Sequence, residues 1–132
     1  MKKVFVSLMA LIVAFALISM TTGQDPTWEV PAKFKNMKNP VEANDASVKA
    51  GGMLYKKHCA SCHGKVGLGD GVKARTLDTF PGDFSTAAYQ DQTDGEHFYK
   101  TKFGRGEMPK YEGKMEDEDM WHMVNYMRTF KK

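Results

Sequence analysis

Two cysteines three positions apart, followed directly by a histidine, are the side chains of this sequence with the clearest chemical potential. They are Cys59, Cys62 and His63, in the run CASCH. This order is typical of covalent haem attachment. Each thiol adds to one vinyl group at the haem edge, so both sulfurs must leave one tight turn, and the histidine that follows can give a ring nitrogen to the iron. The spacing therefore predicts one covalently bound haem c, with Cys59 and Cys62 as its thioether residues and His63 as an axial iron ligand.

Other uses of paired cysteines fit the pattern less well. A thioredoxin-like redox pair needs no histidine at the next position, and it belongs to a βαβ pattern of which the sequence gives no sign. A four-ligand zinc site needs a second close pair of cysteines or histidines, and none follows Cys62. In an oxidising compartment such a pair can also form a disulfide. The adjoining His63 favours haem over all three.

Residues 1–23 have the layout of a secretory signal peptide. Lys2 and Lys3 make a basic start, residues 4–20 form an apolar run, and small residues follow. We therefore expect cleavage near Gly23 and a periplasmic location. The alternative is a retained membrane anchor, for which an apolar run of 17 residues is at the short end.

Net charge gives no reason to expect a nucleic-acid partner. The 132 residues carry 19 basic and 16 acidic side chains, a formal charge of +3. Loss of residues 1–23 removes Lys2 and Lys3 and leaves +1. Two ionised haem propionates would bring the total to about −1. The expected partners are instead redox proteins, a donor and an acceptor, and we expect the chain to be a monomer.

The rest of the chain divides into a leader and one domain. Residues 24–45 contain Pro26, Pro31 and Pro40, each of which biases the preceding residue away from helix. This leader is either an extended segment that wraps onto the domain, as its apolar side chains favour, or a flexible tether. Residues 46–132 form the predicted domain.

The domain shows helical periodicity and no β alternation of useful length. The strongest signal is near the C-terminus, where Met120, Met123, Val124 and Met127 keep the spacing of one helix face. The predicted helices cover residues 46–58, 72–77, 94–102 and 116–130. We expect an all-α domain of about four helices wrapped around one covalently attached haem.

A glycine-rich loop, residues 64–71, follows the histidine of the CASCH run. Such a loop could cradle a phosphate, but a phosphate-binding loop ends in Gly-Lys-Ser/Thr and follows a strand, and neither is present in the sequence. The better interpretation is a chain that bends tightly around a bulky planar group.

The order of these elements resembles that of class I c-type cytochromes, the small monohaem family with His/Met iron ligation. The resemblance spans about residues 46–130. Gly51 and Tyr55 stand eight and four residues before the first cysteine, where the family keeps a glycine and an aromatic residue on its first helix. Met123 and Tyr126 match the positions of the last helix that cross them.

The resemblance implies two further site residues. Pro81 matches the proline whose carbonyl accepts a hydrogen bond from the ring N–H of the ligating histidine, here His63. Such bonds fix the tautomer and orientation of a ligand ring. Met108, between Gly106 and Pro109, matches the distal thioether ligand to the iron.

Other methionines and histidines are rivals for the sixth iron position. Met115 is the reserve for Met108, although a methionine is more often core filler than a ligand. We expect His97 and His122, on predicted helices, to be partly exposed rather than bound to iron, and His58 lies on the wrong side of the attachment turn. Four methionines on predicted helices suit core positions: Met53, Met120, Met123 and Met127.

Ligation by histidine and methionine fills both axial positions of the iron and raises its reduction potential. The sequence therefore predicts an electron carrier, not an enzyme, that moves single electrons in an extracytoplasmic respiratory chain. One alternative is a haem-bearing subunit of a larger respiratory or dehydrogenase complex, such as one in a membrane, attached through residues 24–44. A less favoured one is a haem sensor or peroxidase, which would need Met108 absent or labile. Eight basic side chains either form a docking ring around the haem edge or an ordinary solvated surface: Lys56, Lys57, Lys65, Lys73, Lys100, Lys102, Arg105 and Lys110.

Overall fold

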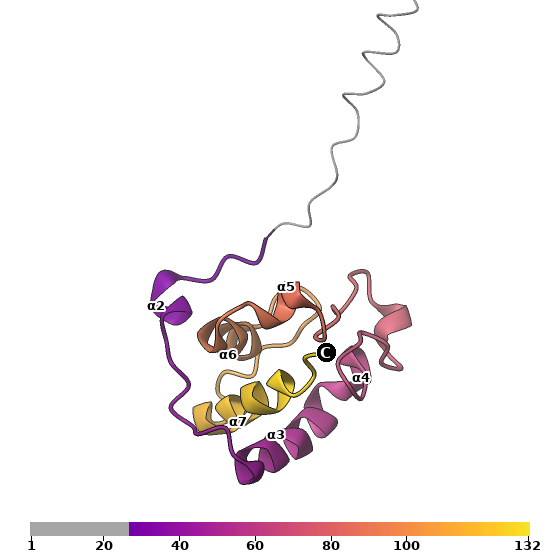
Figure 1. Ribbon diagram of the computed structural model, residues 1–132. Coiled ribbons are helices and arrows are strands. Elements are labelled where there is room, and N and C mark those ends of the chain that lie inside the picture. The colour runs from indigo at the N-terminus through magenta and orange to yellow at the C-terminus, as the bar shows by residue number, and fades with distance from the viewer. Residues whose placement is uncertain (1–26) are drawn as a thin grey trace, which may run out of the picture.

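The computed structural model of the protein describes residues 27–132, which form a helical domain (Figure 1). The predicted signal peptide lies outside the described residues. Within residues 27–132 there are six α-helices, one 3-10 helix and no strand. They are α2 (Ala32–Lys35), α3 (Asp45–His58), α4 (Ala60–His63), η1 (Ala74–Thr76), α5 (Ala87–Gln90), α6 (Asp94–Phe103) and α7 (Asp117–Arg128). In this part of the chain, none of the helices has the length and apolar character needed to cross a membrane.

The all-α class expected from the sequence is confirmed. The four predicted helices correspond to α3, η1, α6 and α7, with ends that differ by a few residues. Three further helices, α2, α4 and α5, are single turns of four residues each. Such short turns carry too few residues to show a helical period in the sequence.

The most extensive contact between helices is the one where α3 crosses α7 (Figure 1). Gly51 lies at the crossing point, and a Cβ atom built on it would stand 2.0 Å from the backbone oxygen of His122. Only a glycine lets the two backbones approach so closely. The neighbouring Gly52 instead faces the ring of Tyr126, 3.0 Å from such a Cβ. The close approach that the sequence suggests for a glycine within the first helix is therefore present.

The core lies between α3, α6 and α7. Trp121 stacks on Phe98 with ring centroids 4.1 Å apart, so α7 and α6 meet through two large apolar faces. The predicted core methionines of α7, Met120, Met123 and Met127, are at most 5% exposed. The core role predicted for Met53 is wrong, because its side chain is 63% exposed. The buried face of α3 runs instead through three residues four apart: Ser47, Gly51 and Tyr55.

Caps explain where the two main early helices begin. The Asn44 side chain accepts a hydrogen bond from the Ser47 N–H at the start of α3. At the start of α6, Thr93 and Glu96 form a capping box, in which each side chain accepts the other residue's backbone N–H. Each arrangement satisfies backbone donors that a helix N-terminus leaves without intrahelical partners.

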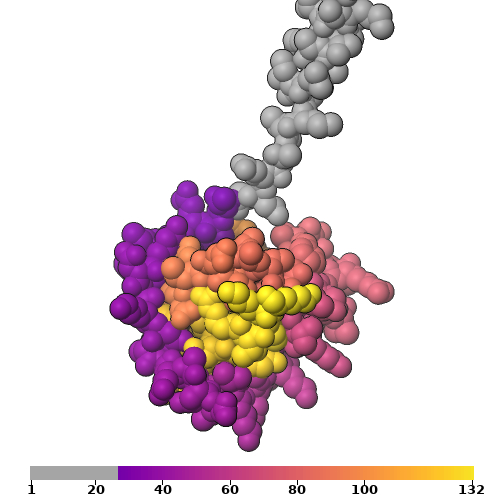
Figure 2. All heavy atoms as spheres, viewed as in Figure 1, coloured from indigo at the N-terminus to yellow at the C-terminus, as the bar shows by residue number. Residues whose placement is uncertain are grey.

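The described part of the leader packs against the domain. Phe34 lies between Tyr99 and Phe103 of α6, with centroid distances of 4.8 and 5.5 Å. A Cβ atom on Gly95 would stand 1.8 Å from the Phe34 carbonyl oxygen, so α2 sits directly on the first turn of α6. In Figure 2 the indigo leader covers one flank, and the pink segment that follows the CASCH run forms the opposite one.

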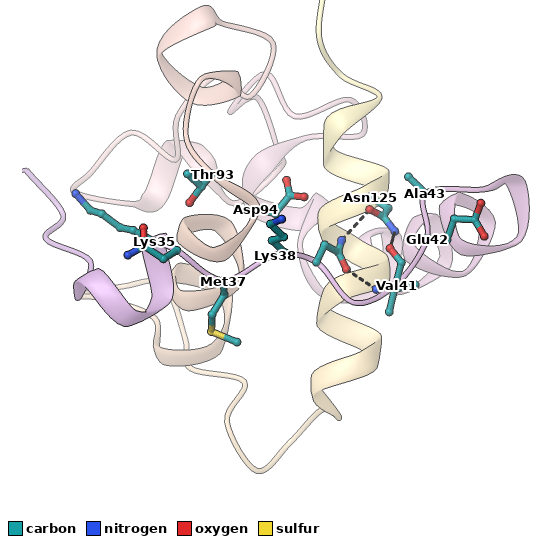
Figure 3. Close-up of a pocket in the computed structure, with 11 residues that line it drawn as sticks. Lys35, Met37, Lys38, Val41, Glu42, Ala43, Thr93, Asp94 and Asn125 are labelled. Carbon is teal, nitrogen blue, oxygen red and sulfur yellow. Dashed lines mark hydrogen bonds between the residues drawn. The ribbon is translucent and has the colours of Figure 1, made fainter.

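Hydrogen bonds also join the leader to α7. The Asn39 side chain donates to the Asn125 side-chain oxygen (2.8 Å), and the Asn125 amide donates to the Val41 carbonyl (3.1 Å) and to the Ser47 hydroxyl (2.8 Å). A surface groove of about 530 Å³ opens between residues 35–43 and the α6–α7 face (Figure 3). None of the residues that line the groove belongs to the CASCH run, so the leader builds this hollow away from the predicted chemistry.

Candidate functional site

The CASCH run directly follows α3: Cys59 joins α3 to α4, and the other four residues of the run are the single turn of α4. α3 ends at His58, and Cys59 caps it by donating its backbone N–H to the Tyr55 carbonyl (2.8 Å). The Cys59 carbonyl then accepts the backbone N–H of His63 (2.9 Å), which closes the single turn of α4. Both sulfurs therefore leave one tight turn, as thioether attachment to one ring edge requires.

The glycine-rich loop runs back along this turn and fixes it. Three successive carbonyls at the end of α4 accept backbone bonds from the loop, pairing His63 with Gly69 (2.9 Å), Cys62 with Gly71 (3.2 Å) and Ser61 with Lys73 (2.8 Å). A Cβ atom on Gly71 would stand 2.4 Å from the Ser61 oxygen. The loop is therefore in backbone contact with the turn, and His63 is held by its main chain.

The His63 ring is enclosed on one side. Its centroid lies 4.6 Å from that of Phe84, and within residues 27–132 the buried Nδ1 atom has no hydrogen-bond partner of normal geometry. Burial lowers the pKa of His63, while the Pro81 carbonyl acts on the ring in the opposite direction as an acceptor. The structure thus brings Pro81 beside His63. With Nδ1 turned into the protein, Nε2 is the nitrogen left for a metal.

The two thiols do not have the character of a reactive redox pair. Both cysteines are free and half-buried, and burial, reinforced by the neighbouring Cys62, raises the pKa of the Cys59 thiol to about 12. A reactive cysteine needs a lowered pKa. In the part of the chain that the structure describes, no cluster of three or more His, Cys, Asp or Glu side chains could hold a metal ion. These observations weigh against the redox-pair and zinc alternatives.

Two tyrosines that the sequence did not assign to the site hold the turn from either side. The buried Tyr55 hydroxyl donates to the Gly64 carbonyl (2.9 Å). The Tyr111 hydroxyl donates to the His58 carbonyl (2.9 Å), and burial raises the Tyr111 pKa to about 12, which keeps the phenol a donor at neutral pH. Tyr111 stands three residues after Met108, so this hydrogen bond connects the segment that contains Met108 to the residue directly before Cys59.

Met108 lies in a small hairpin after α6. Its backbone exchanges both hydrogen bonds with Arg105, at 3.0 and 3.1 Å, around the tip formed by Gly106 and Glu107. A Cβ atom on Gly104 would stand 2.4 Å from the Met108 oxygen, so the hairpin folds onto the end of α6. The Met108 side chain is half-buried. The reserve candidate, Met115, packs instead against the hydrophobic core.

Glu107 joins this hairpin to the loop that contains Pro81. Its carboxylate Oε2 accepts the backbone N–H groups of Asp78 (2.9 Å) and Thr79 (3.2 Å). Sequence reasoning missed this contact, because nothing in the local pattern pairs residues almost thirty positions apart.

The expectation that His97 is partly exposed is wrong. The side chain is 2% exposed, and its ring stacks on Tyr89 at 4.2 Å, which in turn stacks on Phe84 at 4.1 Å. Burial lowers the pKa of His97 to about 3, with the charges of Arg128 and Lys100 acting in the same direction. His122 is half-buried, and its Nδ1 lies 2.8 Å from the Ser47 hydroxyl.

Comparisons with known proteins bear on the family and the fold of the chain. A chain of the Kuenenia stuttgartiensis reducing HAO-like protein complex Kustc0457/Kustc0458 superposes with a TM-score of 0.65 at 21% sequence identity. The match covers 83% of this chain and 53% of that one, so the chain spans about half the length of this neighbour, and the likeness is one of fold. No curated protein matches the chain. The family model described as "Cytochrome C oxidase, cbb3-type, subunit III" matches residues 46–127, more than half of the sequence. The chain therefore belongs to this family and is a monohaem class I c-type cytochrome.

Proposed function

We propose that this cytochrome carries single electrons between redox proteins outside the cytoplasm, in a respiratory chain, with one haem c attached through Cys59 and Cys62. His63 and Met108 are its axial iron ligands. The observation that carries the proposal is the set of backbone hydrogen bonds from residues 69–73 to residues 61–63, which we call the main-chain clamp. With the CASCH turn held in this way, His63 Nδ1 is buried beside the Pro81 carbonyl. When bound, the haem supplies a one-electron couple at its iron.

The residues present fit that group. Two half-buried thiols, one four residues before His63 and one directly before it, match the donors that a thioether-linked haem requires. The Nδ1 atom of His63 is orphaned and buried, and a small shift toward the Pro81 carbonyl would satisfy it while fixing the tautomer that presents Nε2. Phe84 and Tyr89 stack behind the ring and exclude water from that side.

A hairpin that supplies Met108 favours a carrier over a sensor or peroxidase. With His63 and Met108 both holding the iron, no site would be open to a substrate, so electron exchange is the chemistry that the haem would supply. The protein then contributes ligation, a dry surrounding and a docking surface.

Six of the eight basic side chains considered for docking are exposed: Lys56, Lys57, Lys65, Lys73, Arg105 and Lys110. Arg105 and the two half-buried lysines have contacts within the molecule. Lys102 pairs with Asp117 at 2.7 Å, Lys100 contacts Gln92, and both Lys100 and Arg105 lie over the Trp28 ring. A basic docking surface would therefore consist of the five exposed lysines, on α3, in the segment after α4 and after the Met108 hairpin.

The alternative role, as a subunit of a larger complex, has support from the neighbour in a protein complex of Kuenenia stuttgartiensis. The leader argues in the other direction. Its apolar residues Val30 and Phe34 pack on its own domain, so residues 27–45 do not offer a free apolar attachment segment. This contact favours the free carrier.

One experiment tests the proposal directly. The protein is produced with haem-attachment machinery in a host that exports it, and periplasm and membrane are collected separately. We expect a periplasmic protein that begins near Gln24, keeps its colour in acidified acetone, and does not bind carbon monoxide readily in the ferrous state. Complete extraction of haem would contradict covalent attachment. Rapid carbon monoxide binding would replace the carrier by the sensor or peroxidase, and retention of residues 1–23 in the membrane would support the anchored form.

A further inference from the structure

The two bonds accepted by Glu107 connect the loops that hold Pro81 and Met108. Glu107 immediately precedes Met108, and the N–H groups that it binds belong to Asp78 and Thr79, two and three residues before Pro81. Pro81 acts on His63, whereas Met108 is the proposed ligand from the other side. A single carboxylate therefore links the segments that control the two axial positions.

The loop that Glu107 binds is itself fixed to the haem-attachment turn. A Cβ atom on Gly69 would stand 2.5 Å from the Phe80 ring and 2.8 Å from the Gly82 oxygen. Gly69 also donates its N–H to the His63 carbonyl (2.9 Å). The segment of residues 78–82 therefore packs against Gly69 of the main-chain clamp, and this contact fixes the position of the N–H groups that Glu107 binds.

The two residues at the hairpin tip have few neighbours. A Cβ atom on Gly106 would meet nothing within 4 Å among the described residues, and Gly106 and Glu107 are both exposed, while the adjoining Arg105 lies over the Trp28 ring. A tip with so little packing can move away from the domain at low cost. Bonds from a carboxylate to backbone N–H groups are stronger than neutral ones, so Glu107 is well suited to restrain it.

We propose that Glu107 is a positioning residue, which holds the Met108 hairpin against the Pro81 loop and so sets how readily Met108 leaves the iron. This inference rests on the proposed function, in which Met108 is an axial ligand. Glu107 acts through the backbone bonds and does not touch the iron. Because Oε2 alone accepts both bonds, a glutamine oxygen at the same place can make them without a charge.

The experiment measures the far-red absorption band of methionine-ligated ferric haem and the rate at which cyanide replaces the methionine. Four holoproteins are compared with the wild type: Glu107→Ala, Glu107→Gln, Met108→Ala and Glu112→Ala. Glu112 is the matched control, since it is an exposed carboxylate in the next loop whose side chain has no bond or ion pair within the described residues. We expect cyanide to bind Glu107→Ala about tenfold faster, the size of one net bond to a charged group. Glu107→Gln and Glu112→Ala should stay close to the wild type.

The outcomes separate this inference from the assignment of Met108. If Met108→Ala keeps the band, the ligand is wrong, and both proposals fail. If Met108→Ala loses the band but Glu107→Ala binds cyanide at the wild-type rate, only the role of Glu107 fails. Equal acceleration in Glu107→Ala, Glu107→Gln and Glu112→Ala would reveal a general charge effect and also overturn it. Thermal unfolding of each variant checks that the fold is intact. Should Glu107→Ala give no holoprotein, Glu107→Asp, too short to reach both N–H groups, takes its place with the same expectation.

Discussion

The haem-attachment turn and the Met108 hairpin are built by different means. The turn, residues 59–73, is held by a run of backbone hydrogen bonds, and Gly64, Gly67, Gly69 and Gly71 within it are all buried. The hairpin, residues 104–110, is largely exposed, and side chains tie it to the rest: Glu107, Arg105 over the Trp28 ring, and the adjoining Tyr111. The turn is therefore held by backbone hydrogen bonds, whereas the hairpin is held by side chains that single substitutions can remove.

This difference separates two tasks of a cytochrome. Backbone hydrogen bonds are not removed by changing one side chain, so the turn that we propose attaches the haem resists change. Side-chain tethers can be changed singly, so the hairpin with the proposed ligand Met108 is where ligand strength would be adjusted. Variants in the turn should therefore affect the amount of folded holoprotein, and variants in the hairpin should affect ligation.

The largest effect is expected from removing a thiol. Cys59→Ala or Cys62→Ala should sharply reduce the yield of holoprotein, because a covalently bound group at the centre of a small domain stabilises the folded state strongly. Yield is measured as haem absorbance per purified chain. A variant that folds to the same helical content by circular dichroism without haem would contradict this expectation and would show that the turn forms independently of attachment.

A pair of glycines tests the comparison itself. Gly71→Ala places a methyl group 2.4 Å from the Ser61 oxygen, with backbone on both sides, and overpacking of this kind costs about 1–3 kcal/mol or more of unfolding free energy. Gly106→Ala in the hairpin meets no neighbour within 4 Å in residues 27–132, so its cost is limited to a positive φ of 56°, about 1 kcal/mol. Urea unfolding of the two holoproteins measures both. Equal losses would remove the distinction between the two regions.

The stack behind His63 makes a prediction about pH. Burial lowers the pKa of His97 to about 3, below the usual 6.5, so the neutral ring stabilises the fold above pH 6.5 and this contribution is lost as the pH falls toward 3. Between pH 7 and pH 5 the wild type should lose about 2 kcal/mol more unfolding free energy than His97→Phe, which keeps an aromatic ring on Tyr89 but does not titrate. Urea midpoints at the two pH values measure the difference. Parallel losses in the two proteins would show that His97 takes up its proton in the folded state near its usual pKa.

Features that depend on residues close together in the sequence could be predicted from local patterns. The CASCH spacing predicted a tight turn, which α4 forms. The resemblance pointed to Gly51, and the periodicity of α7 predicted its buried methionines. The prediction that Met53 of α3 is a core residue was wrong. The buried face of α3 is set by its crossing with α7 at Gly51 and not by the most apolar residues of the helix.

Contacts between distant segments could not be predicted in this way. The position of α2 depends on Gly95, about sixty residues later. Because Gly95 has no side chain, the Phe34 carbonyl can lie directly against its backbone. The burial of His97 depends on Tyr89, whose position is set by a turn capped by Thr86. The bonds of Glu107 likewise appear only when two loops meet. These features share one cause: the energy lies in tertiary contacts between residues without a common local period.

The smallest effect on the folded chain, and the sharpest test of the hairpin's task, is expected from Met108→Ala. The side chain is half-buried in an exposed loop, so the packing lost on truncation, apart from ligation, should cost only about 1 kcal/mol of unfolding free energy. Met115→Ala, which removes a side chain packed on the core, should cost more, about 2 kcal/mol. The order reverses for ligation. Met108→Ala should abolish the far-red band, open the iron to carbon monoxide and lower the reduction potential, since a methionine ligand raises it, while Met115→Ala should leave all three unchanged. Absorption spectra and redox titrations measure these effects. If Met115→Ala were the variant that loses the band, the ligand would come from the better-packed side chain, and the division between a fixed attachment side and an adjustable ligand side would no longer hold.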